Sequence, residues 1–457
     1  MKAFITSTGL KECHANNRFI RHFFLGLTIL YAVMSLIYYL IGYKVEVPEY
    51  MEQSRVMLTI YYVIMLSSSF MQVKMRQLFV TNAIIFLVMT LMVKFSYYAA
   101  DMPEFGHLAG SDAYFYFNTG TTNYELSIGE YISYLLSNGM KVDDLGYLTI
   151  VYLVHNILPY DYFTIYFIIL INTILIYYST VALYKLQYLF TKNDQLSKFT
   201  ALLYGASPFM VTISSNGLKE IFFVFFVIHF FYHMYMYKQD NSLYHLAFMI
   251  VFGLMSLFFR TAVFYMQVLS LIVCMTANNS NKRLYMLFFF VVLFFVTVVA
   301  NYLMQRFMGF TMEQMAEIVE YRAREQSDTG LVSIINWIAG IIGPLPNFDR
   351  PAAHAFTHNY FSFIKSCFSL FFILSVVEVI RKFVYQYYPI VVFITISIYM
   401  TVVAGVALDV RFHITYLPLF FILATQQLRR INPFVFYGYM ALVVGFFIMY
   451  STRAVTY

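Results

Sequence analysis

Charged residues are scarce in this chain. Only 11% of its 457 residues are Asp, Glu, Lys or Arg, whereas soluble domains carry about a quarter. Hydrophobic residues make up 61%, which excludes a soluble globular protein. The three cysteines, Cys13, Cys274 and Cys367, are widely spaced and predict neither a disulfide framework nor a zinc or redox motif. The sequence also has no nucleotide-binding glycine loop with its Lys, which argues against an ATP-driven pump.

Long apolar runs dominate instead. Runs of roughly 17 to 25 residues, each able to cross a hydrocarbon core of about 30 Å, recur from residue 20 to the C-terminus. We expect an all-α, polytopic transmembrane bundle, because only helices and closed barrels satisfy every backbone group in lipid, and these runs are too long for barrel strands. The expected spans, about thirteen, lie near residues 20–43, 56–72, 78–99, 161–183, 196–213, 218–237, 243–259, 261–277, 284–305, 360–380, 388–406, 412–428 and 433–451.

Two apolar stretches are too short to cross a membrane. Residues 147–158 and 331–345 predict interfacial or re-entrant helices. They fall within the two long loops, 100–160 and 306–359, of a chain that we expect to form a single membrane domain over residues 1–457.

The distribution of Lys and Arg sets the expected orientation. With the N-terminus in the cytoplasm, more than half of the 29 Lys and Arg residues fall in cytoplasmic segments, as the positive-inside rule requires. Most of the 23 Asp and Glu residues and both long loops then fall outside. We therefore expect the functional site on the outer face, where it would handle a polar substrate at the membrane surface.

Several ionisable residues lie near the outer ends of the expected spans. Asp112, in AGSDAYFYFNTG, predicts either a helix N-cap or a general base. The turn SNGLKE holds Lys219 and Glu220 near bilayer level, where ionisable groups are costly and usually functional. A Lys beside helix N-terminal amides makes an anion site, although a capped turn with a snorkelling Lys is the alternative. Arg260, in LFFRTAVF, lies outside against the positive-inside trend and indicates an anionic partner.

The second long loop supplies further candidates. Arg322 and Arg324 project from the end of a predicted surface helix over 313–326. His354 and His358 are four residues apart, but the sequence has no HExxH motif and no evident third ligand, so we expect no metal site.

The segment VALDVRFHIT places Asp409, Arg411 and His413 on alternate positions. A helix rotates successive residues by about 100° and would point Arg411 away from the other two. The three side chains can converge if the segment is an outer turn, and a local salt bridge between Asp409 and Arg411 is the simplest alternative.

The order of these features resembles Wzy-type bacterial polysaccharide polymerases, which assemble O-antigen, capsule or exopolysaccharide, and more loosely the GT-C membrane glycosyltransferases. The resemblance covers about residues 78–425 and rests on GSDAYFYF, GYLTIVYLVHNIL, SNGLKE, FFRT, GPLP and VRFHITYLPLF. It implies a multi-pass enzyme of the bacterial inner membrane that works at the periplasmic face. Its reaction would transfer an oligosaccharide repeat unit from undecaprenyl pyrophosphate to an acceptor sugar hydroxyl of a lipid-linked glycan.

Such a transfer needs cations around the leaving pyrophosphate and a base near the acceptor hydroxyl. We expect Asp112 to be that base, with His358 or His413 as the alternative. Glu220 and Asp409 would orient the cations. The expected pyrophosphate ligands are Lys219, Arg260 and Arg411, assisted by Arg322 or Arg324. No cofactor is expected, although an acid near a pyrophosphate can recruit Mg²⁺.

The expected partners are the undecaprenyl-pyrophosphate-linked oligosaccharide, membrane lipid, a chain-length regulator and a flippase, and no nucleic acid. Two other functions stay open. One is a GT-C enzyme that adds a single sugar from a polyprenyl-phosphate donor, and the other is a lipid-linked oligosaccharide flippase or transporter. A transporter should show inverted repeats or charges at span midpoints, and Lys94 and Lys365 are the intramembrane charges in this sequence.

Overall fold

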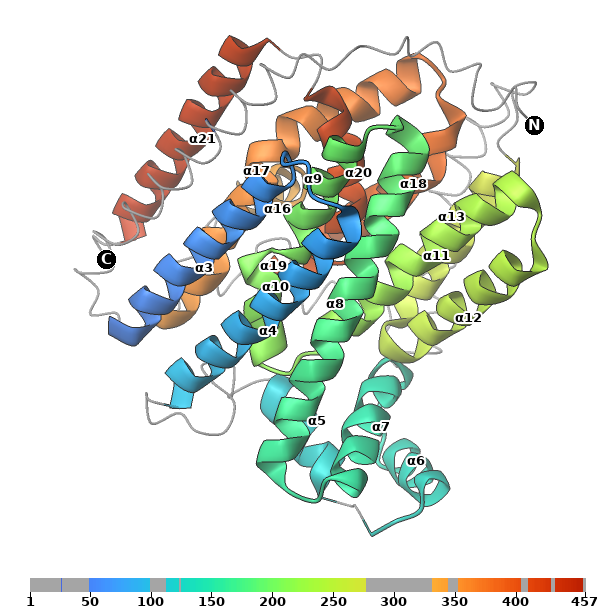
Figure 1. Cartoon of the computed structure of the whole chain (residues 1–457). Helices are drawn as coiled ribbons and strands as arrows, with labels where there is room; N and C mark the ends of the chain where they lie inside the picture. The colour runs from blue at the N-terminus through green and yellow to red at the C-terminus, as the bar shows by residue number, and fades with distance from the viewer. Residues whose placement is uncertain are drawn as a thin grey trace.

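The chain is described by a computed structural model that covers Gly26 and residues 49–98, 112–122, 125–276, 331–343, 352–403, 410–428 and 432–454. Every secondary-structure element in these ranges is a helix (Figure 1). The all-helical class predicted from the sequence is therefore confirmed.

The helices follow one another with short connections in most of the described ranges. Their bounds are α3 Glu49–Ser68, α4 Met75–Tyr98, α5 Asp112–Thr121, α6 Ile128–Ser137, α7 Val142–Ile157, α8 Asp161–Thr191, α9 Asp194–Gly205, α10 Pro208–Ser215, α11 Glu220–Asp240, α12 Leu243–Phe259, α13 Thr261–Thr276, α16 Leu331–Ile342, α17 Ala352–Arg381, η1 Tyr385–Tyr387, α18 Tyr388–Val403, α19 Val410–His413, α20 Leu417–Gln427 and α21 Pro433–Ala454.

Four segments in the described part are long and apolar enough to cross a membrane. They are Met75–Phe95, Asp161–Thr191, Glu220–Asp240 and Tyr385–Val402. Five shorter apolar helices accompany them, so the expected count of about thirteen spans stays a prediction. The expected spans near 20–43 and 284–305 lie outside the described residues.

Helices α9, α10, α11 and α20 form the centre of the bundle. All eight residues of α10 are buried. In α11, 72% of the apolar stretch that could cross a membrane is buried, against 39% of the corresponding stretch in α4. Helix α8 packs against α9 and α11 and runs along the front of the bundle in Figure 1. The short helices α5, α6 and α7 gather at the end where α8 begins, which we call the α5–α7 end.

The expected span near 196–213 is two helices rather than one. Proline has no N–H and its ring clashes with the preceding turn, so α9 ends at Gly205 and α10 starts at Pro208. Side chains from neighbouring helices satisfy carbonyls at this break. The Tyr62 hydroxyl donates to the Leu203 carbonyl at 3.1 Å, and Asn82 Nδ2 donates to the Gly205 carbonyl at 2.9 Å. Such replacement of backbone partners is what permits a broken helix at membrane depth.

The other expected elements differ mainly in their ends. The expected span near 412–428 is the single turn α19 followed, after a turn, by α20, and α8 extends to Thr191. The two stretches expected to be short helices, 147–158 and 331–345, are helical as α7 and α16.

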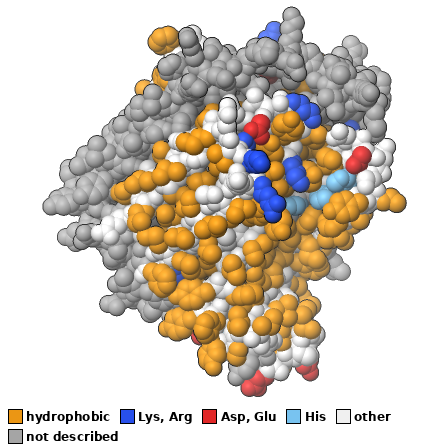
Figure 2. Space-filling model, in the orientation of Figure 1, with side chains coloured by type: hydrophobic (Ala, Val, Ile, Leu, Met, Phe, Trp, Pro, Cys, Tyr) orange, Lys and Arg blue, Asp and Glu red, His pale blue; other side chains and the backbone are white. Residues whose placement is uncertain are grey.

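Charged side chains gather at the two ends of the face shown in Figure 2. Lys and Arg lie mostly toward the end opposite α5–α7, with some Asp and Glu among them; a broad hydrophobic surface follows, and the charged side chains seen at the α5–α7 end are mainly Asp and Glu. This arrangement fits a bundle surrounded by lipid along its middle.

Candidate functional site

The turn between α10 and α11 has a defined geometry. The Gly217 N–H donates to the Ser214 carbonyl at 3.1 Å, and the Leu218 N–H donates to the Ile213 carbonyl at 3.3 Å. These two bonds form a Schellman motif, which requires a left-handed residue just past the helix, and Gly217 has φ of +59°. The turn therefore delivers Lys219 and Glu220 directly to the start of α11.

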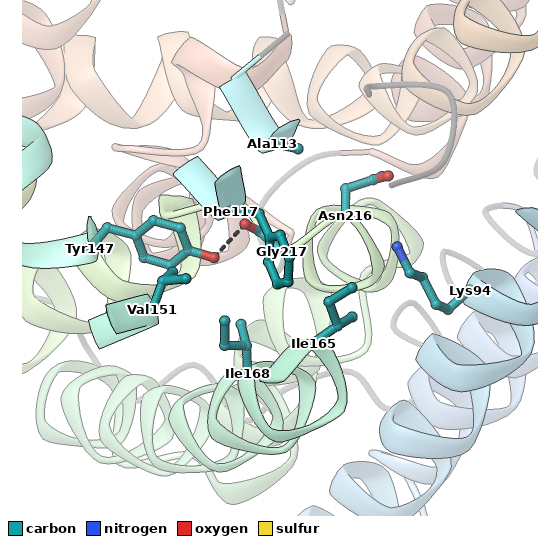
Figure 3. A pocket seen from close by; sticks show the side chains of 9 residues that line it. All are labelled: Lys94, Ala113, Phe117, Tyr147, Val151, Ile165, Ile168, Asn216 and Gly217. Carbon is teal, nitrogen blue, oxygen red and sulfur yellow. Dashed lines mark hydrogen bonds between the residues drawn. The ribbon is translucent and has the colours of Figure 1, made fainter. Parts of the chain in front are cut away.

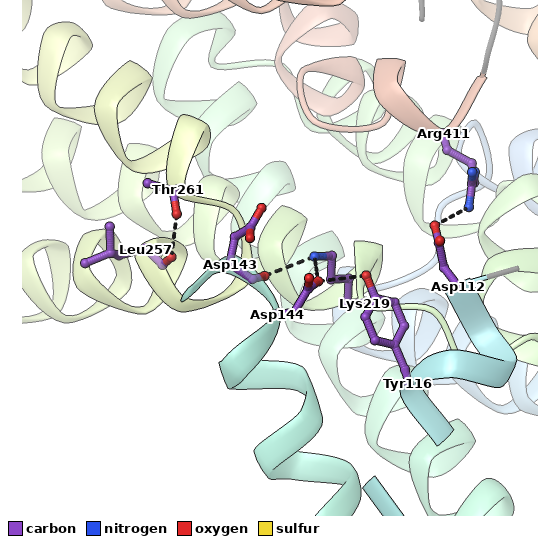
Figure 4. Close-up of polar contacts among 8 residues, drawn as sticks. All are labelled: Asp112, Tyr116, Asp143, Asp144, Lys219, Leu257, Thr261 and Arg411. Atoms are coloured by element: carbon purple, nitrogen blue, oxygen red, sulfur yellow. Dashed lines mark hydrogen bonds and ion pairs between the residues drawn. The ribbon is translucent and has the colours of Figure 1, made fainter. Parts of the chain in front are cut away.

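Lys219 is held by α5 and α7 (Figure 4). Its ammonium forms an ion pair with the Asp144 carboxylate and donates to the Asp143 carbonyl at 3.0 Å. It also lies 5.4 Å from the centre of the Tyr116 ring, a cation–π contact. Tyr116 in turn donates to Asp144 at 2.8 Å. Burial is the main cause that raises the pKa of the Tyr116 hydroxyl, and the Asp144 carboxylate is the second. The hydroxyl therefore stays protonated and acts as a hydrogen-bond donor.

Glu220 is a buried carboxyl close to three cations. Only 6% of the residue is exposed, and its Oε2 atom has no hydrogen-bond partner within the described residues. Arg411, Arg260 and Lys219 all lie near enough for their charges to act on this carboxyl. The sequence-predicted cations therefore converge on one acid at the α5–α7 end, although they come from three separate parts of the chain.

Asp112 is the first residue of α5 and pairs with Arg411 of α19. Arg411 Nη1 lies 3.1 Å from Asp112 Oδ2, and the two side chains are 17% and 56% exposed (Figure 4). The pair spans nearly 300 positions of sequence, so neither local pattern predicted it. The carboxylate partner expected for Arg411 was Asp409, which lies outside the described residues.

Arg260 joins the C-terminus of α12 to α13 and is stacked between two aromatic rings. Its guanidinium carbon lies 5.2 Å from the centre of the Phe223 ring and 4.8 Å from that of Phe412. Within the described residues, no hydrogen bond or ion pair of this guanidinium occurs. Its five N–H donors are thus held in a fixed plane and remain available to a ligand.

His413 lies away from this group of charges. It is 2% exposed, and its Nδ1 atom lies 2.7 Å from both Lys365 Nζ and the Tyr416 hydroxyl. The alternation in VRFH therefore separates its side chains: Arg411 reaches Asp112, while His413 enters the buried interior. This placement removes His413 from our set of candidate bases.

Three other predicted site residues have no described side chain. Arg322 and Arg324 lie outside the described residues. His358 belongs to α17, and its side chain is likewise outside the description.

A narrow pocket lies behind the α10–α11 turn (Figure 3). Its walls are mainly apolar and come from α5, α7 and α8, with Lys94 and Asn216 as its polar side chains. Tyr147 crosses it and donates to the Gly217 carbonyl. Lys94, one of the intramembrane charges singled out in the sequence, is thus close to the turn that carries Lys219.

Sequence reasoning missed two members of the site, Asp144 and Tyr116. In the sequence, Asp143 and Asp144 look like acids that favour the start of α7, and Tyr116 is one of 42 tyrosines. A signal did exist, since an acid pair at the start of a short outer helix is a natural partner for a lone Lys in a neighbouring outer turn.

No metal site is evident in the described part of the chain, where no group of three or more His, Cys, Asp or Glu side chains could hold an ion. No protein family model, curated protein or solved structure matches the chain. The described residues of the site supply a stacked guanidinium with no acceptor among them, two cations in ion pairs, and an exposed carboxylate. This set can bind an oxyanion and accept a proton next to it.

Proposed function

We propose that the protein is a Wzy-like membrane glycosyltransferase that elongates a lipid-linked glycan. It would transfer an oligosaccharide repeat unit from undecaprenyl pyrophosphate to a sugar hydroxyl of the acceptor glycan. The observation that carries the proposal is the stacked Arg260 guanidinium, which lies within the same electrostatic cluster as Arg411, Lys219 and Glu220. A planar guanidinium with free N–H donors suits the bidentate recognition of phosphate oxygens.

In the proposed reaction, each part of this cluster has one role. The acceptor hydroxyl oxygen attacks the anomeric carbon of the donor, and a new C–O bond forms. The C–O bond to the pyrophosphate breaks, and the pyrophosphate leaves with the bonding electrons. Arg260 and Arg411 stabilise the negative charge that develops on it, and the hydroxyl proton passes to the Asp112 carboxylate.

In this scheme the Asp112–Arg411 ion pair is the resting state of the site. The donor pyrophosphate attracts Arg411 and releases Asp112, which is then free to accept a hydrogen bond from the acceptor hydroxyl. Because a general base must lie within hydrogen-bond reach of its proton, the exposed position of Asp112 at the start of α5 supports this exchange. Lys219 contributes a fixed positive charge from its ion pair with Asp144.

We further propose that the α5–α7 end faces the periplasm of a bacterial inner membrane and that the chain crosses it about thirteen times. The Lys and Arg side chains, which gather mostly at the opposite end, support this orientation (Figure 2). A chain-length regulator and a flippase are the protein partners that this function would require.

The test is the length of lipid-linked glycans in a strain without the gene, complemented with variants. Arg260→Ala and Asp112→Asn should each leave single repeat units and abolish long chains, while Arg260→Lys should restore them only in part because it cannot bind bidentately. Arg381→Ala is the matched control, because Arg381 is an exposed arginine at the end of α17, and it should give normal chains.

Other outcomes would reassign or reject the function. Chains of normal length that lack one sugar favour the single-sugar transferase, and accumulation of repeat units on the cytoplasmic side favours transport. If well-expressed Arg260→Ala and Asp112→Asn variants both make full-length chains, the proposed site is wrong.

A further inference from the structure

The short helix α19 carries Arg411 but cannot hold its own position. It has only four residues, Val410–His413, whereas isolated helices shorter than about 12 residues are marginal even in favourable sequences. A tertiary contact must therefore fix the direction in which Arg411 points. One such contact is the hydrogen bond between His413 of α19 and Lys365 of α17.

Lys365 sits at a junction of three segments. Its Nζ atom lies 2.9 Å from the Gly340 carbonyl of α16, 2.7 Å from His413 Nδ1 and 3.0 Å from the Tyr416 hydroxyl. An ammonium has three N–H donors, so each has one acceptor. Lys365, His413 and Tyr416 are 3%, 2% and 0% exposed, so solvent has almost no access to this hydrogen-bond network.

The end of α16 is shaped to receive this network. The Tyr416 hydroxyl lies 3.2 Å from the Gly340 carbonyl, and Ser369 donates to the Ile342 carbonyl. The C-terminal end of a helix carries partial negative charge and favours a cation. The carbonyls of α16 thus supply the charge compensation that a buried ammonium needs, without a carboxylate among its bonded partners.

The contacts that hold α19 in place also affect a second cation of the site, Arg260. Phe412 lies between Arg411 and His413 in α19, and its ring is one of the two that stack against Arg260. A shift of α19 would therefore misplace the Arg411 side chain and remove one face of the aromatic stack that orients Arg260.

We propose that Lys365 is a positioning residue: through His413 and Tyr416 it locks α19 to α16 and α17 and so sets the placement of Arg411 and Phe412. The anchor itself follows from the contacts, while its catalytic consequence rests on the proposed function. This role gives a purpose to the second intramembrane lysine of the sequence, which the transfer chemistry does not use.

The test measures the proximity of α5 and α19 without any turnover. In a chain whose three native cysteines are replaced by alanine, Asp112→Cys and Arg411→Cys are introduced and cross-linked with a short bifunctional thiol reagent. Adding Lys365→Met should slow cross-linking roughly tenfold, within the range for residues of one network. Lys198→Met is the matched control, because Lys198 is a lysine of similar burial, 4% exposed, in α9.

The outcomes separate positioning from general destabilisation. An unchanged cross-linking rate in Lys365→Met, or an equal slowing in Lys198→Met, overturns the proposal. If Lys365→Met does not accumulate in the membrane, Tyr416→Phe replaces it. That variant removes one hydroxyl from the network and should slow cross-linking to a smaller extent, and the parent rate would overturn the proposal.

A second readout concerns activity. Because Lys365 is proposed to act through both Arg411 and Phe412, adding Lys365→Met to Arg411→Lys should lower glycan transfer by a smaller factor than it does in the parent protein. Additive losses would contradict positioning. Since cross-linking needs no substrate, it decides the anchor even if the proposed transfer reaction is absent.

Discussion

The ion pair between Lys219 and Asp144 offers the sharpest quantitative test of how the site is built. Its two side chains are only 11% and 16% exposed, so it resembles a buried pair more than a surface one. Removing one partner of a buried pair costs about 3 to 5 kcal/mol, because it leaves an uncompensated charge. For Asp144→Asn we expect about 3 kcal/mol, since Lys219 keeps the Asp143 carbonyl and the Tyr116 ring.

A double-mutant cycle isolates the pair itself. Asp144→Asn, Lys219→Met and the double variant are compared by the free energy of unfolding, followed by far-UV circular dichroism in mixed micelles titrated with SDS. The double variant should be more stable than the sum of the single losses predicts, with a coupling of about 2 kcal/mol.

The size of the coupling free energy shows whether the ion pair between Lys219 and Asp144 is buried or exposed to water. Solvent-exposed ion pairs typically contribute about 0.2 to 1 kcal/mol. A coupling in that range would mean that water reaches Lys219 and Asp144, and the treatment of this ion pair as a buried one would be wrong.

Three further predictions concern the elements that carry the site. Gly217→Ala should destabilise the protein by roughly 1 kcal/mol in the same unfolding assay, since alanine is strained at a φ of +59°. Gly146→Val should cost about 1 to 3 kcal/mol, because a Cβ there would lie 2.5 Å from Phe259, and a loss near zero would show that α7 and α12 can separate. Ser127 and Glu130 form a capping box at the start of α6, and the hydrogen bonds of Ser127 lower the pKa of Glu130. The capping box therefore stabilises α6 fully at pH values above the ordinary pKa of Glu, and this stabilisation is lost as the pH falls through the lowered pKa. Hydrogen exchange at the start of α6 should therefore accelerate on acidification, and Ser127→Ala should abolish that pH dependence.

The sequence was sufficient for the helices and for much of the site. Apolar runs predicted the helical class, and the turn SNGLKE placed Lys219 and Glu220 between two expected helices, although the break at Pro208 within the expected span 196–213 appears only in the structure. These features depend on local chemistry, which a single sequence displays directly.

The pairings within the site were not predictable in this way. Asp112 meets Arg411 and Asp144 meets Lys219 only because α5 and α7 fold onto distant helices, and no local pattern encodes such contacts. His413 shows the opposite error: Arg411, two positions earlier, faces the site, but a rotation of about 100° per residue directs the imidazole of His413 into a buried network with Lys365. The spacing of residues in the sequence identified suitable residue types, but not the directions in which their side chains point.

The Asp112–Arg411 contact has a consequence for selectivity among anions. The carboxylate is tethered to α5, so it competes for the guanidinium at a high effective concentration. A free inorganic ion such as phosphate or sulfate would have to displace this built-in competitor through its contacts with the cations alone. If the proposed donor binds here, its lipid anchor would concentrate it at the membrane and add contacts of its own, so the protein's carboxylate would select against small ions from the surrounding water.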